Sequence, residues 1–322
     1  MRLIIPAVIA CVVAVGLPVV STAAYPERVI TMIVAYVPGG GTDVVARALV
    51  PYIEKHLGPG AKIVVVNRSG AGGEIGFAAI ANAPTDGYTI GFINTPGVVT
   101  IPIERPAQYT WQRFDLLGNV VDDPSCFAVH ADSGFSNLAQ LAAYAKANPG
   151  AVSVGTPGIG STGHLAVLAF ARLAGTQVNH IPFKGTGEVR TALAGRQIVV
   201  AAITVGECYQ TLKGGTPLRT LAQLSAGRTT LAPELATAKE QGYNVEMASL
   251  RGLAAPRGLP ADVRGRLVKA IEQAVVDSEF QVKSVQYYVP LRYLSPSEFE
   301  AELREADSQF RQLWKEVPWS EK

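Results

Sequence analysis

The chain has 322 residues, a formal net charge of +2, 48% apolar residues and 17% charged residues. This composition is typical of a globular protein and not of a disordered one, and a net charge so small gives no strong field for binding nucleic acid. The length predicts about two domains, each with its own core.

The first 24 residues differ from the rest of the chain. Arg2 precedes an apolar run from Leu3 to Val20, and the small residues Ser21–Ala24 follow it. This order is typical of a secretory signal peptide, so we predict that residues 1–24 are removed and that the mature protein is periplasmic. The alternative is an N-terminal membrane anchor, because the apolar run approaches the length that spans a bilayer.

The next stretch predicts a strand, a glycine loop and a helix. Val29–Val34 is β-branched and apolar, Pro38–Gly41 is a turn, and a run of helix formers follows from Val44 to Lys55. Glycines let a ligand approach the backbone, and a helix N-terminus offers unpaired N–H groups and a partial positive charge. The stretch therefore predicts a small anion site, with a purely structural turn as the alternative. Its candidate ligand-binding residues are Gly39, Gly40, Gly41, Thr42 and Asp43.

A second βα unit follows. Lys62–Asn67 is a predicted strand, Glu74–Ala83 a helix and Tyr88–Ile93 a further strand, after which Thr95 is a candidate ligand-binding residue. A βαβαβ order predicts a parallel sheet with helices on both faces, and ligands bind beyond the carboxyl ends of its strands. The loop glycines fit a dinucleotide pattern only loosely, and no acidic residue ends the next strand, so no cofactor is predicted.

The opening pattern recurs in the middle of the chain. After a segment predicted to be irregular (Ile101–Tyr109), the strand Ser125–His130 is predicted to lie beyond a crossing into a second domain. A short strand, the glycine loop Gly155–Gly160 and the helix Gly163–Ala174 then predict a second anion site. Its candidate residues are Gly160, Ser161, Thr162 and His164. His164 has a structural role as its alternative, and Ser161 lacks the Gly-x-Ser-x-Gly elbow of a hydrolase.

The remaining chain continues the alternation of strands and helices. Ile198–Thr204 is a predicted buried strand, and Leu218–Leu224 is the predicted return crossing to the first domain. The later predicted elements are the helices Leu138–Asn148, Leu231–Gln241, Val263–Ser278 and Ser297–Trp314 and the strand Leu291–Leu294.

Cysteines and histidines give little sign of redox or metal chemistry. Cys126 and Cys208 remain in the mature chain, where either a disulfide or two buried thiols fits an exported protein. The histidines are scattered without metal-ligand spacing, so no metal site is predicted.

The ordered set of motifs resembles one family. The segments that carry the resemblance are Val37–Arg47, Val66–Gly76, Pro84–Thr89, Gly155–Leu165, Pro182–Gly185 and Gly252–Pro256. They are similar to the Bug-type proteins (TctC family), which are the extracytoplasmic solute-binding proteins of tripartite tricarboxylate transporters. The resemblance extends from Tyr25 to Trp314.

The resemblance implies an α/β protein of the type II periplasmic-binding-protein fold, with two α/β domains joined by two crossing strands and a ligand cleft between them. Domain I would hold residues 25–121 and 222–322, and domain II residues 122–221. The implied function is capture of a small mono-, di- or tricarboxylate and its delivery to membrane permease subunits, without catalysis, cofactor or nucleic acid. We expect a monomer. The alternatives are a sensor component that signals to a membrane kinase and a cleft hydrolase.

Two positions depart from the family pattern. Arg251 stands where many members have an aromatic residue, and Thr204–Glu207 stands where many have Asp or Asn. Lys184, Thr204 and Arg251 complete the candidate ligand-binding residues. We hypothesise that Arg251 clamps a second, distal carboxylate of the ligand, the alternative being a structural arginine paired with a nearby Asp or Glu.

Overall fold

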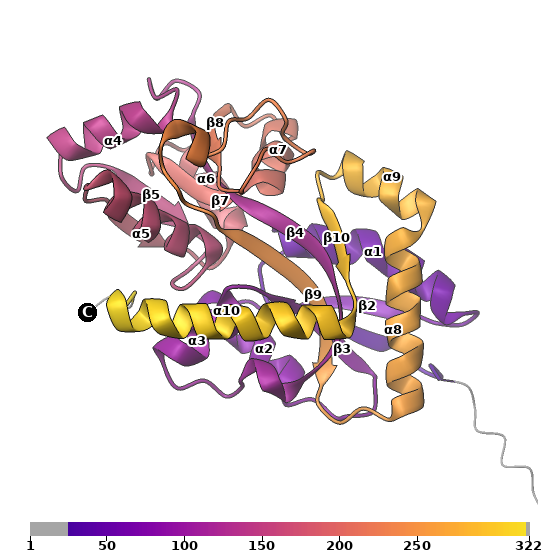
Figure 1. Ribbon diagram of the computed structural model, residues 1–322. Helices are drawn as coiled ribbons and strands as arrows, with labels where there is room; N and C mark the ends of the chain where they lie inside the picture. The colour runs from indigo at the N-terminus through magenta and orange to yellow at the C-terminus, as the bar shows by residue number, and fades with distance from the viewer. Residues whose placement is uncertain (1–24, 320–322) are drawn as a thin grey trace, which may run out of the picture.

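The structure, a computed structural model, describes residues 25–319, so the predicted signal peptide lies outside the described residues. Two α/β lobes lie side by side, and the long strands β4 (Phe114–His130) and β9 (Ala248–Pro256) run between them (Figure 1). The first lobe holds β1–β3, β10, α1–α3 and α8–α10, and the second lobe holds β5–β8 and α4–α7.

The strands form one continuous hydrogen-bonded path in the order β2-β1-β3-β9-β4-β7-β5-β6, with β8 and β10 paired to β4. Strands β1, β2 and β3 are parallel, as are β5, β6 and β7, whereas β4 and β9 are antiparallel to their neighbours. The other strands are β1 (Ile30–Val34), β2 (Ile63–Asn67), β3 (Thr89–Asn94), β5 (Ser153–Thr156), β6 (Asn179–Pro182), β7 (Val200–Thr204), β8 (Leu218–Gln223) and β10 (Leu291–Leu294).

Helices cover the sheet and bury its apolar side chains in separate clusters in each lobe. The helices are α1 (Gly41–Leu57), α2 (Glu74–Ala81), α3 (Gly97–Glu104), α4 (Leu138–Ala147), α5 (Thr162–Ala174), α6 (Thr186–Ala194), α7 (Val205–Lys213), α8 (Ala261–Val276), α9 (Ser278–Gln286) and α10 (Pro296–Glu316). Within residues 25–319, none of them combines the length and apolar character that crossing a bilayer requires.

Strand β4 belongs to both lobes. Its first part, Phe114–Pro124, pairs with β9, and its second part, Ser125–His130, pairs with β7 and β8. The strand runs through Pro124 without a break, although proline has no N–H to donate to a ladder. The crossing expected near Ser125 is thus the middle of one long strand.

The return crossing lies later than predicted. Strand β8 pairs with β4 over Cys126–His130, and Leu224 and Val245 pack in the core of the second lobe. The chain therefore returns to the first lobe along β9. The domain boundaries stay a prediction.

Two local predictions are wrong. The predicted helix Leu231–Gln241 is only a 3-10 turn at Lys239–Gln241. The Gln223 side chain takes the carbonyl groups of Ala232 and Leu235 as acceptors, which holds this segment in an irregular path. The segment Ile101–Tyr109 was expected to be irregular, yet its first residues belong to α3, because packing of the apolar residues Val98, Val99 and Ile101 into the first-lobe core outweighs the proline at position 102.

Candidate functional site

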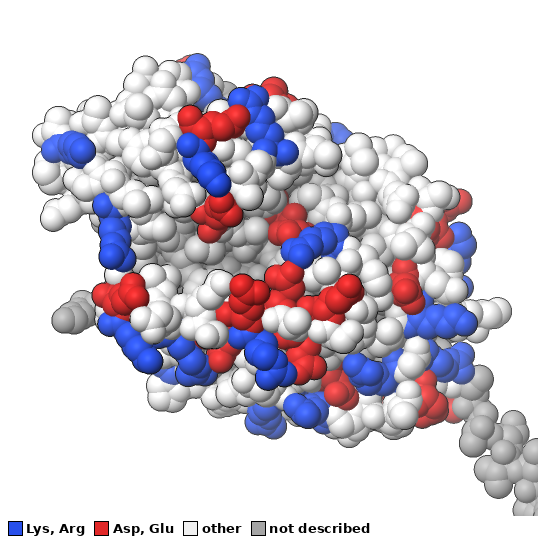
Figure 2. All heavy atoms as spheres, viewed as in Figure 1, with Lys and Arg blue, Asp and Glu red and all other residues white. Residues whose placement is uncertain are grey.

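A cavity lies between the two lobes. Its volume is about 50 Å³, several times the roughly 10–15 Å³ that holds one water molecule. Residues of both lobes line it, including Thr42 and Asn94 from the first and Thr162 and Glu207 from the second. Figure 2 shows the groove between the lobes, with acidic and basic side chains gathered at its rim.

Five helix N-termini converge on this cavity. The lining includes Gly41 of α1, Gly97 of α3, Thr162 of α5, Thr186 of α6 and Glu207 of α7, each in the first turn of its helix. All five helices follow directly on strands of the sheet, β1, β3, β5, β6 and β7. Because carboxyl ends of parallel strands meet at one edge, the helices that follow them begin near the same place. Their unpaired N–H groups and partial positive charges favour an anion there.

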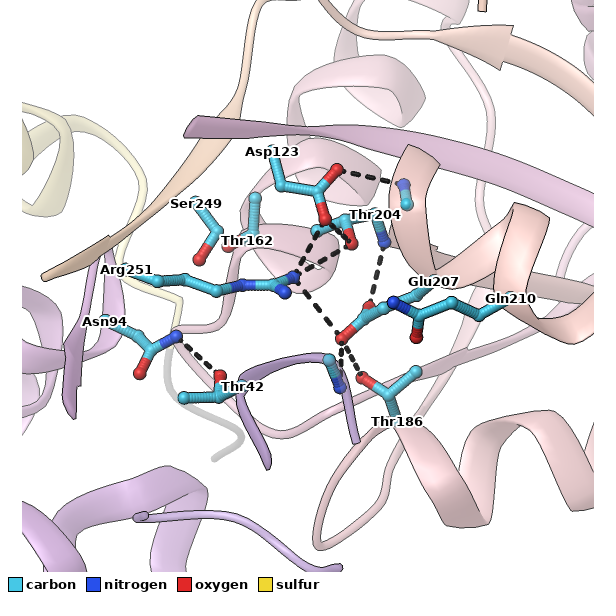
Figure 3. A network of polar contacts seen from close by, with 12 residues as sticks. Thr42, Asn94, Asp123, Thr162, Thr186, Thr204, Glu207, Gln210, Ser249 and Arg251 are labelled. Atoms are coloured by element: carbon cyan, nitrogen blue, oxygen red, sulfur yellow. Dashed lines mark hydrogen bonds and ion pairs between the residues drawn. The ribbon is translucent and has the colours of Figure 1, made fainter. Parts of the chain in front are cut away.

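The carboxylate of Glu207 occupies the N-terminus of α1. It reaches across from the second lobe, and its Oε1 accepts hydrogen bonds from the Gly41 N–H at 3.3 Å and from Thr186 Oγ1 at 3.0 Å (Figure 3). Its Oε2 accepts from the Thr204 N–H at 3.1 Å, and the Thr204 side chain accepts in return from the backbone N–H of Glu207, which forms a capping box at the start of α7. The anion site predicted at the first glycine loop is therefore filled by the protein's own carboxylate.

Arg251 is paired inside the protein. Its Nη2 donates to Asp123 Oδ2 and to Thr204 Oγ1, both at 3.0 Å, and lies 3.5 Å from Glu207 Oε1. The residue is 3% exposed. Of the two alternatives for Arg251, the structure shows the arginine paired with acidic residues, although the side chain also lines the cavity.

Asp123 is the more deeply buried partner of Arg251. It accepts hydrogen bonds from Thr204 Oγ1 at 2.6 Å and from the Gly206 N–H at 3.0 Å. Burial raises the pKa of Asp123 to about 6, and the nearby Glu207 carboxylate adds to the rise, whereas Arg251 opposes it. The carboxyl group is therefore mostly ionised at neutral pH.

Asn94 brings an unpaired acceptor to the same end of the cavity. It stands opposite Arg251 in the β3–β9 ladder, and its Nδ2 donates to Thr42 Oγ1 at 2.9 Å. Its Oδ1 is buried and has no hydrogen-bond partner within the described part of the chain. No described residue supplies the hydrogen-bond donor that a buried oxygen such as Asn94 Oδ1 normally has.

The N-terminus of α5 forms the other end of the cavity. The Ser161 side chain caps the helix by accepting from the His164 N–H at 3.3 Å. Thr162 and Gly163 line the cavity, and their N–H groups have no acceptor among residues 25–319. Gly163 lets the helix approach β7, since a Cβ there would lie 2.0 Å from the Ala202 carbonyl oxygen. Two N–H donors thus stay available at this end.

Comparison with known proteins gives the family. Residues 45–287 match the family described as "Tripartite tricarboxylate transporter family receptor" (TctC). The chain belongs to this family. The relative BugT of Bordetella pertussis is 32% identical over 260 residues, which cover 80% of this chain and 79% of BugT.

Solved structures agree with the assignment to the TctC family. The periplasmic binding protein BugD is 30% identical, with a TM-score of 0.85 over 92% of this chain and 100% of BugD. The R. palustris protein Rpa4515, solved with adipate, is 26% identical, with a TM-score of 0.85 over 90% of this chain and 97% of that chain. The predicted family and the two-domain periplasmic-binding-protein fold are confirmed, and this chain is a solute-binding receptor of the TctC family.

Most of the predicted ligand-binding residues of this TctC receptor are brought together. Those that line the cavity are Gly40, Gly41, Thr42, Thr95, Ser161, Thr162, Thr204 and Arg251. Their contact with a ligand stays a prediction.

The other predicted residues lie outside the cavity wall. Asp43 accepts from the Gly39 N–H at 2.9 Å and so holds the first glycine loop in place. Burial alone would raise the pKa of Asp43, but hydrogen bonds from Arg47, Gly39 and Asn67 outweigh it and lower that pKa.

A histidine holds the second glycine loop, Gly155–Gly160, in place. His164 Nδ1 accepts from the Gly160 N–H at 3.0 Å, and the ring stacks on His180 with 4.0 Å between centroids. Burial lowers the pKa of His164 to about 3, so the ring is neutral. Lys184 is exposed at the start of the turn before α6 and does not line the cavity.

Sequence reasoning did not name Glu207, Asp123 or Asn94 as ligand-binding residues, although it marked the segment Thr204–Glu207 as a departure from the family pattern near the specificity region. For Glu207 a usable pattern was present, because Thr204 followed three residues later by glutamate is a capping box, which places both side chains at one helix start. No comparable pattern marks Asp123 or Asn94, whose positions depend on strand pairing.

Cys126 and Cys208 are both buried free thiols, so the structure contains the thiol alternative and not the disulfide. Within the described residues, no three His, Cys, Asp or Glu side chains gather as metal ligands would.

Proposed function

We propose that this receptor captures a small carboxylate in the cavity between its lobes and delivers it, unchanged, to the membrane subunits of a tripartite tricarboxylate transporter. The observation that carries the proposal is the convergence of five helix N-termini on one cavity. Such an arrangement favours an anion and provides backbone donors for carboxylate oxygens. The adipate in the structure of Rpa4515, a relative of this chain, is consistent with a small carboxylate.

The binding step follows from contacts between the lobes. Thr100 Oγ1 donates to the Gly160 carbonyl at 2.8 Å, Thr162 Oγ1 donates to the Thr95 carbonyl at 3.5 Å, and Arg190 donates to the Gly39 carbonyl. These bonds close the cavity and have to open before a ligand can enter. The crossing strands β4 and β9 provide the hinge for this motion.

Chemistry on the ligand is not part of the proposal. Ser161 Oγ accepts from the backbone N–H of His164, and the ring Nδ1 of His164 accepts from Gly160. The two side chains therefore serve the helix start and the loop, and they do not form a nucleophile and base pair.

Location and partners follow from the family and from residues 1–24. The predicted signal peptide and membership of a periplasmic family support action in the periplasm. We expect the receptor to act there as a monomer. The permease subunits would recognise the outer surface of the ligand-closed receptor.

A calorimetric and thermal-shift screen tests the proposal. Mono-, di- and tricarboxylic acids are compared with their methyl esters, which keep the carbon skeleton and lose the charge. We expect at least one acid to bind with a stoichiometry of one and to raise the melting temperature, and its ester to bind far more weakly. Equal binding of acid and ester, or no response to any acid, would contradict carboxylate capture.

A further inference from the structure

The charged side chains at one end of the cavity are unequal in number. Arg251 supplies one positive charge, and Asp123 and Glu207 supply two carboxylates within hydrogen-bond or ion-pair distance of it. All three are nearly fully buried, with 3%, 1% and 5% of their surface exposed. We call these three residues the Arg251 cluster. Before any ligand enters, the cluster already holds more negative than positive charge.

Several hydrogen-bond donors at this end of the cavity already bind the protein's own carboxylates. The Gly41 N–H and Thr186 Oγ1 donate to Glu207 Oε1, and the Gly206 N–H donates to Asp123. Other N–H groups of Arg251 can still bind a neutral oxygen such as an amide carbonyl. A further anion would face two carboxylates in a poorly solvated cavity, where like charges repel strongly.

An acceptor without a donor stands next to this cluster. Asn94 lines the cavity and is 4% exposed, and its buried Oδ1 has no hydrogen-bond partner among residues 25–319. Figure 3 shows Asn94, Thr42 and Arg251 side by side, with Glu207 beyond them. A ligand group that donates hydrogen bonds would satisfy Asn94 and would be attracted to Glu207.

We propose that Glu207 makes this receptor selective for a monocarboxylate whose far end is a hydrogen-bond donor (an amide, hydroxyl or ammonium group) over a dicarboxylate. The inference rests on the proposed function. The ligand carboxylate accepts from the free N–H groups of Thr162 and Gly163, and the donor end meets Asn94 Oδ1 and Glu207. This reverses our hypothesis that Arg251 clamps a distal carboxylate. It also distinguishes this chain from Rpa4515, which was solved with adipate, a dicarboxylate.

Matched pairs of probes isolate the far end of the ligand. Succinate, glutarate and adipate are each compared with the monoamide of the same length, in which one carboxylate oxygen is replaced by an NH₂ group. Calorimetric titrations are run well above the pKa of about 6 of Asp123, so that this carboxyl group is ionised. We expect the wild-type protein to bind the monoamide of the best length about tenfold or more tightly than the diacid.

The variant Glu207→Gln tests the residue itself. Glutamine keeps the capping box with Thr204, so α7 is expected to form, but it removes one of the two carboxylate charges. We expect the preference for the monoamide to fall by about tenfold or to reverse in favour of the diacid. The matched control is Glu272→Gln, an exposed position on α8 in the first lobe, which should keep the wild-type preference.

The outcomes separate the two proposals. Wild-type binding of a diacid as tight as its monoamide, or an unchanged ratio in Glu207→Gln, would overturn the selectivity inference and leave carboxylate capture standing. No binding of any of these acids or monoamides at millimolar concentration would overturn the inference together with the proposed function.

Discussion

Substitution of Gly41 by alanine is expected to weaken ligand binding without lowering the stability of the fold. A Cβ at Gly41 would lie 2.5 Å from Arg251 Nη1 and 2.6 Å from Glu207 Oε1, whereas ordinary contacts begin near 3.4 Å. Gly41 begins α1 and is not among the residues with positive φ, so alanine fits its backbone. The charged groups that approach α1 would have to retreat by about 1 Å.

The expected loss can be estimated from the bond that this retreat breaks. The Gly41 N–H donates to the Glu207 carboxylate at 3.3 Å, and a hydrogen bond to a charged group contributes about 1.5–3 kcal/mol. Ligand affinity should fall by about 10- to 150-fold, because the lobes can no longer close fully. In ligand-free protein with open lobes this bond is absent, so the free energy of unfolding should stay the same or rise by up to about 1 kcal/mol, since alanine favours a helix over glycine.

Calorimetry gives the affinity and urea unfolding gives the stability. Gly265→Ala in α8 is the matched control, because a Cβ there meets nothing within 4 Å. The control should gain stability and keep wild-type affinity. Wild-type affinity in Gly41→Ala, or an equal loss in both variants, would refute the reasoning.

Three further predictions concern closure and the buried charges. Gly160 has a φ of +70°, and a Cβ there would lie 2.9 Å from Thr100 Oγ1. Gly160→Ala should therefore lower the free energy of unfolding by about 1–2 kcal/mol and weaken ligand binding. Wild-type values for both, from urea unfolding and calorimetry, would contradict this prediction. The pKa of Asp123 is raised from 3.8 to about 6, so the unfolded chain binds fewer protons between these values, and the contribution of this group to stability falls as the pH rises through them, by roughly 3 kcal/mol at most. Across this pH range, the free energy of unfolding measured with urea should fall less with rising pH in Asp123→Asn than in the wild type. An identical slope against pH in both proteins would contradict the role of burial. Small-angle scattering of protein stripped of ligand by unfolding and refolding should show a larger radius of gyration than the same sample saturated with the best-binding acid, and equal radii would argue against a hinge at β4 and β9.

Much of the fold could be predicted because its elements are encoded locally. The units β1–α1 and β5–α5 were predicted from apolar runs followed by glycine loops, and α5 is capped by Ser161 as expected. The predicted anion sites followed from the same patterns, since a helix N-terminus has its donors wherever the helix forms. The helix expected at Leu231–Gln241 failed because Gln223, outside the segment, binds its carbonyl groups.

The side-chain contacts around the cavity could not be predicted from local sequence. Glu207 reaches Gly41 across 166 positions of sequence, and Arg251 reaches Asp123 across 128. Each contact depends on the packing of the two lobes and on the register of β4 against β9. The sequence therefore indicated where an anion can bind, whereas the structure shows that one of these places is taken by the protein's own carboxylate.

The most direct test of carboxylate capture is an amide NMR titration with the best-binding acid of the screen. We predict that the N–H signals of Thr162 and Gly163 move downfield and saturate at one equivalent, because these free donors at the start of α5 bind the ligand carboxylate. Saturating binding that leaves both signals in place would contradict the account.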